Sequence, residues 1–202
     1  MKVNIEKYNP YWVNLFAEES NNIKRILGDE LHSIHHIGST SIPHISAKPI
    51  IDIMPIVNNI DNVDKYNLAF EEFDYDVHGE YGIVNRRYFT KLDKETNKKL
   101  YHVHIYDRKD VKNIIRHLAF RDFLIEFPEV AKEYEDLKMT LINKYCGDKE
   151  QYVNGKNEFV KMTEKLAINW YLENKKVKEL ARYSTKEEAF SASNINESDK
   201  IL

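Results

Sequence analysis

Residues 49–57 constrain the fold more than any other part of the sequence, because this run is apolar and mostly β-branched except for one acid, Asp52. Such a run is typical of a central strand that is covered on both faces. A carboxylate in these surroundings is costly unless it is paired, hydrogen-bonded or bound to a metal. The run therefore predicts a buried central strand that carries a polar site at Asp52.

Hydrophobic periodicity predicts helices and further strands on either side of this run. In chain order, the predicted elements are a helix over 10–27, a strand over 33–37, a turn over 38–41, the strand over 49–57, a helix over 58–73 with Asp61 as its cap, strands over 75–77, 86–92 and 100–106, and helices over 111–126, 128–146 and 156–174. This order indicates an α/β or α+β protein with a mixed sheet, flanking helices and a helical C-terminal part.

The length of 202 residues suits one domain with a sizeable core. Only 6 Gly and 5 Pro are present, so little of the chain can serve as flexible linker. Apolar residues become sparse after residue 174. We therefore expect a single domain over 1–174 and a weakly ordered tail over 175–202.

Charge and cysteine content limit which cellular compartments and which classes of binding partner fit this chain. The net charge of −3, from 30 basic and 33 acidic residues, gives no general attraction to nucleic acid. The lone cysteine allows no internal disulfide, which fits a reducing compartment. The first residues lack the apolar core of a signal peptide, and no stretch approaches the ~20 apolar residues of a membrane span. We expect a cytoplasmic protein without a membrane or nucleic-acid partner.

The turn after the first predicted strand is a candidate phosphate site. Gly38 permits close approach of the backbone to a ligand, and the amides and hydroxyls of Ser39, Thr40 and Ser41 supply donors. Lys48 is a further phosphate-binding candidate just before the acidic strand. The alternative is structural: Gly38 makes a tight turn whose amides hydrogen-bond Asp52.

His102 and His104 form a second candidate group. Residues two apart on a strand share a face, and the alternate residues of this strand are the more apolar ones. An H-x-H pair suits metal or phosphate, because imidazole is a good ligand and a tunable donor. Packing without a ligand is the alternative.

Arg87 is a further candidate for binding phosphate, since its guanidinium fork matches that group. The alternative is that Arg87 forms an ion pair with an acid such as Glu80.

Several motifs together resemble the GrpB family over about residues 5–171. The resemblance is carried by His36-Ile37-Gly38-Ser39-Thr40-Ser41-Ile42-Pro43, Ala47-Lys48-Pro49-Ile50-Ile51-Asp52-Ile53, Gly79-Glu80-Tyr81-Gly82-Ile83, Arg86-Arg87-Tyr88-Phe89, His102-Val103-His104 and Phe120-Arg121-Asp122-Phe123-Leu124. It implies a nucleotidyltransferase-like fold in which the Gly-Ser turn holds a triphosphate and acids on the following strands bind Mg²⁺.

The chain departs from the pattern that the resemblance implies. Asp52 matches the first acid, but Met54 stands at the second acid position and a histidine at the third. The family usually has a glycine after Pro43, where this chain has His44, which either adds a ligand or reshapes the turn. One carboxylate cannot build a two-metal site, so Glu80 or the histidines would have to replace the missing ligands, or transfer is lost.

These features lead to three expectations about function. The first is binding of a nucleotide or small phosphorylated metabolite, with nucleotidyl transfer to a small acceptor. Asp52, His102 and His104 would be catalytic, and Asp52, Glu80 and His104 would hold a divalent metal, Mg²⁺ or Mn²⁺, with Zn²⁺ as the alternative. The second is a non-catalytic binding module, which the fusion of related domains to dephospho-coenzyme A kinase associates with coenzyme A metabolism. The third is a metal-dependent hydrolase that uses Asp52, His102 and His104.

Overall fold

The computed structural model describes residues 4–174, and the predicted tail over 175–202 lies outside the described residues. Two compact units make up the described chain. One unit contains residues 9–41 and 49–110 and holds the β-sheet; we call it the sheet unit. The other contains residues 4–8, 42–48 and 111–174 and is mainly helical; we call it the helical unit.

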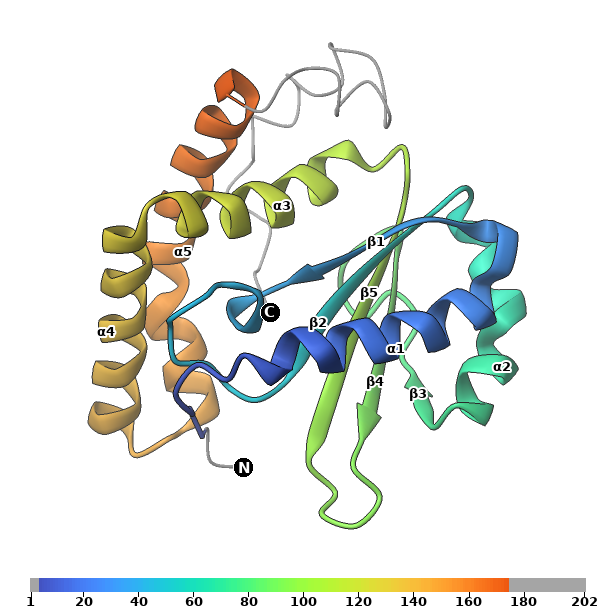
Figure 1. Ribbon diagram of the computed structural model, residues 1–202, viewed down its shortest axis with the longest axis horizontal. Helices are drawn as coiled ribbons and strands as arrows, with labels where there is room; N and C mark the ends of the chain where they lie inside the picture. The colour runs from blue at the N-terminus through green and yellow to red at the C-terminus, as the bar shows by residue number, and fades with distance from the viewer. Residues whose placement is uncertain (1–3, 175–202) are drawn as a thin grey trace. The chain divides into compact units, whose positions relative to one another are not determined.

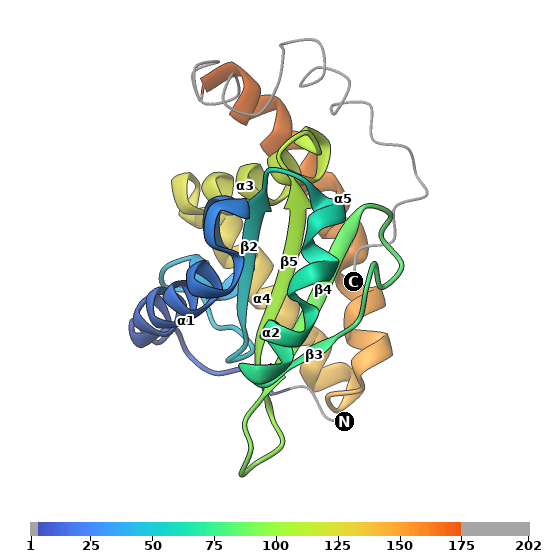
Figure 2. The same cartoon turned by 90° about the vertical axis from the view of Figure 1, so that its right-hand side faces the viewer.

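The sheet unit is built on five strands in the order β1-β2-β5-β4-β3 (Figure 2). The strands are β1 (Leu31–Ile37), β2 (Ile51–Val57), β3 (Tyr75–Val77), β4 (Arg86–Leu92) and β5 (Lys99–Asp107). β2 and β5 pair in parallel, and the other neighbours pair antiparallel, so the sheet is mixed as the sequence predicted. The apolar run that predicted a central strand is β2, which has a neighbour on each side.

Helices α1 (Tyr11–Leu27) and α2 (Asn67–Glu72) cover one face of this sheet. Figure 1 shows α1 lying across the strands, where its Phe16 stacks on His36 of β1. Phe70 of α2 stacks on Phe89 of β4 at 4.1 Å between ring centroids. The apolar side chains on this face include Ile53, Val103 and Ile105, which are fully buried. The residues that alternate with them on β2 and β5 point to the other face.

The region after β2 differs from the single helix predicted over 58–73. It forms a 3₁₀ segment, η3 (Ile60–Tyr66), followed by α2. The cap is Asn59 rather than Asp61: the Asn59 side chain accepts a hydrogen bond from the Asp61 amide at 2.9 Å. A short polar side chain that bonds the backbone in this way favours a turn over a continuous helix.

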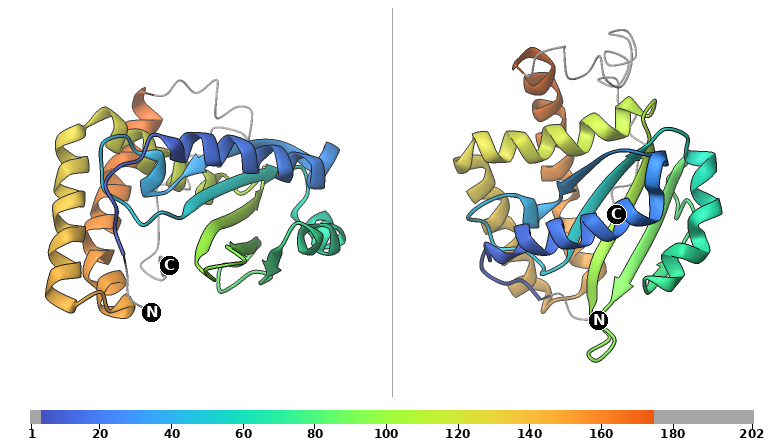
Figure 3. Two further views of the ribbon diagram at one scale, coloured as in Figure 1. Left: turned by 60° about the horizontal axis from the view of Figure 1, so that its bottom comes forward. Right: turned by 45° about the vertical axis from the view of Figure 1, so that its right-hand side comes forward.

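The helical unit contains α3 (Val111–Glu126), α4 (Pro128–Tyr145) and α5 (Lys149–Asn174), with α5 packed against both other helices (Figure 3). The predicted start of α5 at residue 156 is wrong. Asp148 accepts a hydrogen bond from the Gln151 amide and starts the helix earlier. Gly155, which looks like a break in the sequence, lies inside α5 where a Cβ would come within 2.3 Å of Leu141 of α4. Close helix packing therefore explains this glycine.

Residues 42–48 belong to the helical unit although they connect β1 to β2 in the chain. The Glu135 carboxylate accepts a hydrogen bond from the Ser46 amide at 2.6 Å, and the Lys138 ammonium donates to the Ser46 carbonyl at 2.5 Å. Ile42 and Ile45 pack in a core with Leu124, Ala131, Tyr134 and Val160. We call these two hydrogen bonds from α4 to Ser46 the Ser46 clamp.

In the part of the chain that the structure describes, no helix combines the length and the apolar character that a membrane crossing requires.

Candidate functional site

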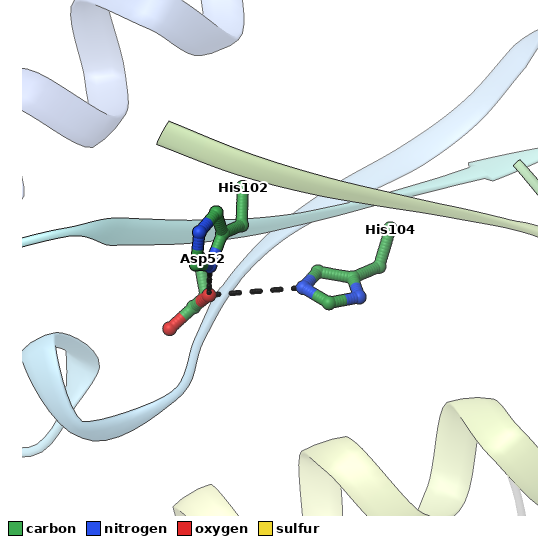
Figure 4. A group of neighbouring side chains, drawn as sticks. All are labelled: Asp52, His102 and His104. Carbon is green, nitrogen blue, oxygen red and sulfur yellow. Dashed lines mark hydrogen bonds and ion pairs between the residues drawn. The ribbon is translucent and has the colours of Figure 1, made fainter. Parts of the chain in front are cut away.

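A cluster of three side chains lies on the face of the sheet opposite to the one that α1 and α2 cover. Its members are Asp52, His102 and His104. The parallel register of β2 and β5 places Asp52 directly beside His102, and strand alternation places His104 on the same face. The Asp52 Oδ1 lies 3.0 Å from His102 Nδ1 and 3.7 Å from His104 Nε2. Figure 4 shows both rings directed at this one oxygen, while the second carboxylate oxygen points away from them. The three residues thus form one group.

The surroundings set the charge of this group. Burial alone would raise the pKa of Asp52. The hydrogen bonds of His102 and His104, and the positive charges these rings carry at the low pH where the carboxylate titrates, outweigh burial and hold that pKa well below its usual range. Burial lowers the pKa of His104, and the nearby Asp52 compensates only in part. At neutral pH the group therefore contains an ionised carboxylate and a neutral His104, the forms that bind metal ions.

One nitrogen of His102 is left unsatisfied. Its Nδ1 faces Asp52, whereas its buried Nε2 has no hydrogen-bond partner among the described residues. Such an atom costs about 1–3 kcal/mol when nothing replaces water around it. Unsatisfied buried polar atoms are rare in native proteins, and a bound ion or water is one explanation for them; four other such atoms among the described residues lie outside this cluster.

The predicted phosphate turn lies directly against the Asp52 carboxylate. Gly38 has a φ of +72°, and a Cβ added to it would lie 2.3 Å from Asp52 Oδ2. The next residues form a 3₁₀ turn, η2 (Ser39–Ser41). The Ser41 hydroxyl donates to the Gly38 carbonyl at 2.6 Å, and the buried Thr40 hydroxyl lies 3.0 Å from His36 Nε2. Thr40 and Ser41 therefore hold the turn in shape.

Two of the predicted residues lie away from this cluster in the sheet unit, and a third belongs to the helical unit. Arg87 points to the opposite face of the sheet and makes a bidentate ion pair with Asp64, not with Glu80. Glu80 lies in the loop of residues 78–85, where its carboxylate accepts a hydrogen bond from the Asn85 amide at 2.7 Å. Lys48 belongs to the helical unit, where its ammonium lies 4.6 Å from the Tyr152 ring centroid.

Two residues that sequence reasoning passed over lie beside the histidines. Cross-strand pairing of β4 with β5 places Tyr88 opposite His104 and puts Arg86 on the same face. The Arg86 guanidinium is almost fully buried and lies 3.4 Å from His104 Nδ1. The Tyr88 ring centroid is 5.0 Å from that of His104. The register of β4 with β5 shifts between Lys91 and Leu92, so counting pairs back from the hairpin loop would not have found Arg86.

The cluster fits one metal ion better than two. Asp52, His102 and His104 each present a ligand atom, all within 4.8 Å of one another. Ligand atoms bound to Zn²⁺ at about 2.0–2.2 Å in tetrahedral geometry are separated by about 3.3–3.5 Å, close to the spacing here. Met54 is fully buried at the position where a second acid would stand. Two histidines and one carboxylate suit a transition metal, whereas a two-Mg²⁺ site would need more oxygen ligands.

The mixed sheet, the Gly-Ser turn and the acid on the central strand are together consistent with the nucleotidyltransferase-like superfamily. Within that class the chain belongs to the GrpB family, because the family model described as "GrpB protein" matches residues 2–166. The resemblance noted in the sequence is thereby confirmed.

Individual relatives agree with this assignment. The chain is 43% identical to UPF0157 protein YqkA of Bacillus subtilis over 84% of its own length, and it spans about half of that relative, 48%. It is 37% identical to glutamate-rich protein GrpB of Alkalihalophilus pseudofirmus, over 74% of this chain and 86% of the relative. The crystal structure of conserved protein GrpB from Enterococcus faecalis matches with a TM-score of 0.79 and 40% identity, over 83% of this chain and 99% of that one.

Proposed function

We propose that the chain binds a nucleotide or another small phosphate-bearing metabolite beside the Gly38 turn and acts on it with one divalent metal ion. The observation that carries this proposal is the contact between the turn and the acid: Gly38 lies against one Asp52 oxygen while both histidines face the other. A phosphate held by the turn would then lie next to the metal ligands. We assign nucleotidyl transfer to a small acceptor as the reaction, in keeping with the superfamily.

Each residue has a distinct part in this proposal. Backbone amides of η2 would donate to phosphate oxygens, and Gly38 permits the close approach. Asp52, His102 and His104 would hold the ion, which would offset phosphate charge when bound. Arg86 brings a buried positive charge to the same face, 3.4 Å from His104. It would add to the attraction for an anionic substrate.

Hydrolysis is a second candidate reaction, and a specific observation favours it. Three protein ligands with a remaining open position are typical of catalytic zinc sites, in which the metal activates a water molecule. The buried Met54 instead favours a third outcome, a module that binds without catalysis. The products formed from a bound nucleotide distinguish these possibilities.

The test is calorimetric titration of Mn²⁺, Zn²⁺ and Mg²⁺, followed by nucleoside triphosphates and tripolyphosphate, into wild type, Asp52→Asn and Asp64→Asn. We expect about one equivalent of metal in wild type, with affinity at least tenfold weaker in Asp52→Asn. Asp64→Asn is the matched control because it removes an acid on η3 that pairs with Arg87 on the opposite face.

Product analysis then decides the reaction: transfer gives pyrophosphate with a nucleotidylated acceptor, whereas hydrolysis leaves the acceptor unmodified and gives either NDP with phosphate or NMP with pyrophosphate. Phosphate-ligand binding that is identical with EDTA and in Asp52→Asn would contradict the role of the metal. No binding of any phosphate compound by wild type would refute the proposed function as a whole.

A further inference from the structure

The loop of residues 78–85, between β3 and β4, has a backbone that few sequences adopt. Four of its residues have positive φ: Gly79 at +60°, Tyr81 at +47°, Gly82 at +81° and Asn85 at +62°. For a bulky residue such as Tyr81 this conformation costs about 1–2 kcal/mol. Strained positions of this kind are concentrated in functional sites. The proposed function above does not account for this loop.

The buried Arg86 holds the loop in place. Its guanidinium donates to the Glu80 carbonyl at 3.2 Å and to the Tyr81 carbonyl at 2.8 Å. The Tyr88 amide donates to the Gly79 carbonyl at 2.8 Å. These bonds fix the main chain on both sides of Tyr81, so its side chain is presented from a rigid base.

The Tyr81 ring is stacked on one ring, contacts a second, and is still half exposed. It lies 5.0 Å from the Tyr88 ring with an interplanar angle of 20°, and 5.3 Å from the His78 ring. Tyr81 nevertheless remains 52% exposed, whereas Tyr88 beneath it is 7% exposed. An exposed aromatic ring, held flat by a second ring, is the arrangement on which bases stack in nucleic-acid-binding proteins.

This pair of rings continues directly into the metal cluster. The Tyr88 ring centroid is 5.0 Å from that of His104 and 5.8 Å from that of His102. Tyr81 is therefore one ring removed from His104, on the same side of the sheet.

We infer that Tyr81 is the stacking platform for the nucleobase of the substrate, which is then a nucleotide rather than a phosphorylated compound without an aromatic ring. This inference rests on the proposed function, because the cluster next to Tyr88 must receive the phosphates. A surface tyrosine without a ligand would gain nothing from a left-handed backbone that Arg86 holds in place. Stacking depends on the flat face that every base has, so the platform discriminates little among bases.

The test compares ligands with and without a base. Affinities of ATP, GTP, CTP, UTP and tripolyphosphate are measured with Mn²⁺ for wild type, Tyr81→Leu, Tyr81→Phe and Tyr11→Leu. Tyr11 is the matched control, since it is a tyrosine of the sheet unit that is 51% exposed at the start of α1. We expect Tyr81→Leu to bind all four nucleotides about 10- to 100-fold more weakly, with tripolyphosphate unchanged. Tyr81→Phe and Tyr11→Leu should match wild type.

Two results would overturn the inference, and they differ in what they say of the proposed function. Equal affinity of wild type for nucleotides and tripolyphosphate, or nucleotide affinity unchanged in Tyr81→Leu, removes the platform and leaves the phosphate site standing. No binding of tripolyphosphate or of any nucleotide removes both. Urea unfolding of Tyr81→Leu and Tyr11→Leu shows whether both variants are folded to the same degree.

Discussion

At the scale of single residues, Gly38 places the turn against Asp52 in the proposed metal site. We predict that Gly38→Ala lowers the free energy of unfolding by about 2–4 kcal/mol and weakens metal binding. The added methyl group would meet Asp52 Oδ2 at 2.3 Å and would adopt a φ of +72°, so both overpacking and backbone strain contribute. Urea unfolding and metal titration measure the two effects.

Gly28→Ala is the control for backbone strain. Gly28 also has a positive φ, +52°, but a Cβ there would meet nothing within 4 Å. We expect it to lose stability through strain alone and to keep wild-type metal affinity. Equal metal affinity in the two variants would contradict a role for the Gly38–Asp52 contact.

His44 stands where the family resemblance leads us to expect glycine, and its backbone conformation is one that glycine adopts without strain. Its φ of +68° is left-handed, which an L-residue adopts at a cost of about 1–2 kcal/mol. We predict that His44→Gly raises the free energy of unfolding by about 0.5–1 kcal/mol, the gain being reduced by the greater freedom of glycine when unfolded. His44→Ala keeps the strain and removes the ring contact with Tyr8, so it should not stabilise. Urea unfolding midpoints of the two variants, at an unchanged dependence on urea, measure the difference in stability. If His44→Ala also stabilised the protein, backbone strain would not be the cause.

At the scale of elements, α4 contains a lysine in an unusual setting. Lys138 is 2% exposed, and burial, with Lys156 acting in the same direction and Glu135 opposing it, lowers its pKa from 10.5 to about 7. Between pH 7 and 10 the unfolded chain therefore binds more protons at this residue than the folded chain. Stability contributed by Lys138 consequently rises with pH across this window, and below pH 7 the cost of the buried charge is present in full.

We predict that wild type gains stability between pH 7 and 9.5 relative to Lys138→Met, by at most about 1.4 kcal/mol per pH unit. Urea unfolding at a series of pH values supplies the slopes. Lys144→Met, which removes an exposed lysine of the same helix, should keep the wild-type slope. If the stability of wild type and of Lys138→Met changed with pH in the same way, the pKa of the buried amine would not be lowered.

Elements whose signals are local could be predicted from the sequence. The bounds of β3, β4 and α3 agree with the predicted ranges, because alternation and a following proline mark them. The fold class follows from the order of the predicted elements, and alternation predicts that His102 and His104 share a face. Their grouping with Asp52 was implied by the family resemblance. The choice between Arg86 and Arg87 could not be made in this way, since it depends on the register of β4 with β5. The early start of α5 could not be predicted locally, because Gly155 is explained by the approach of Leu141 from another helix.

At the scale of the whole molecule, the chain passes from the sheet unit to the helical unit and back before it completes the sheet. The segment of residues 42–48, which belongs to the helical unit, follows the Gly38 turn and precedes Asp52 in the chain. Composition predicted one domain over 1–174, and periodicity gave no indication of this division. A segment of seven residues carries too few positions for a pattern, and its partners lie far along the chain.

The Ser46 clamp has a consequence for the order in which the protein is made. Its two partners on α4 lie 89 and 92 residues after Ser46. At about 5–20 residues per second, a ribosome releases Ser46 roughly 5–20 s before Glu135 and Lys138. In the last part of that interval, after residue 107, both strands of the candidate site have been synthesised, while the segment joining the turn to Asp52 still lacks its anchor. The anchoring of this segment is thus timed by the synthesis of a helix that contributes no residue to the group of Asp52, His102 and His104.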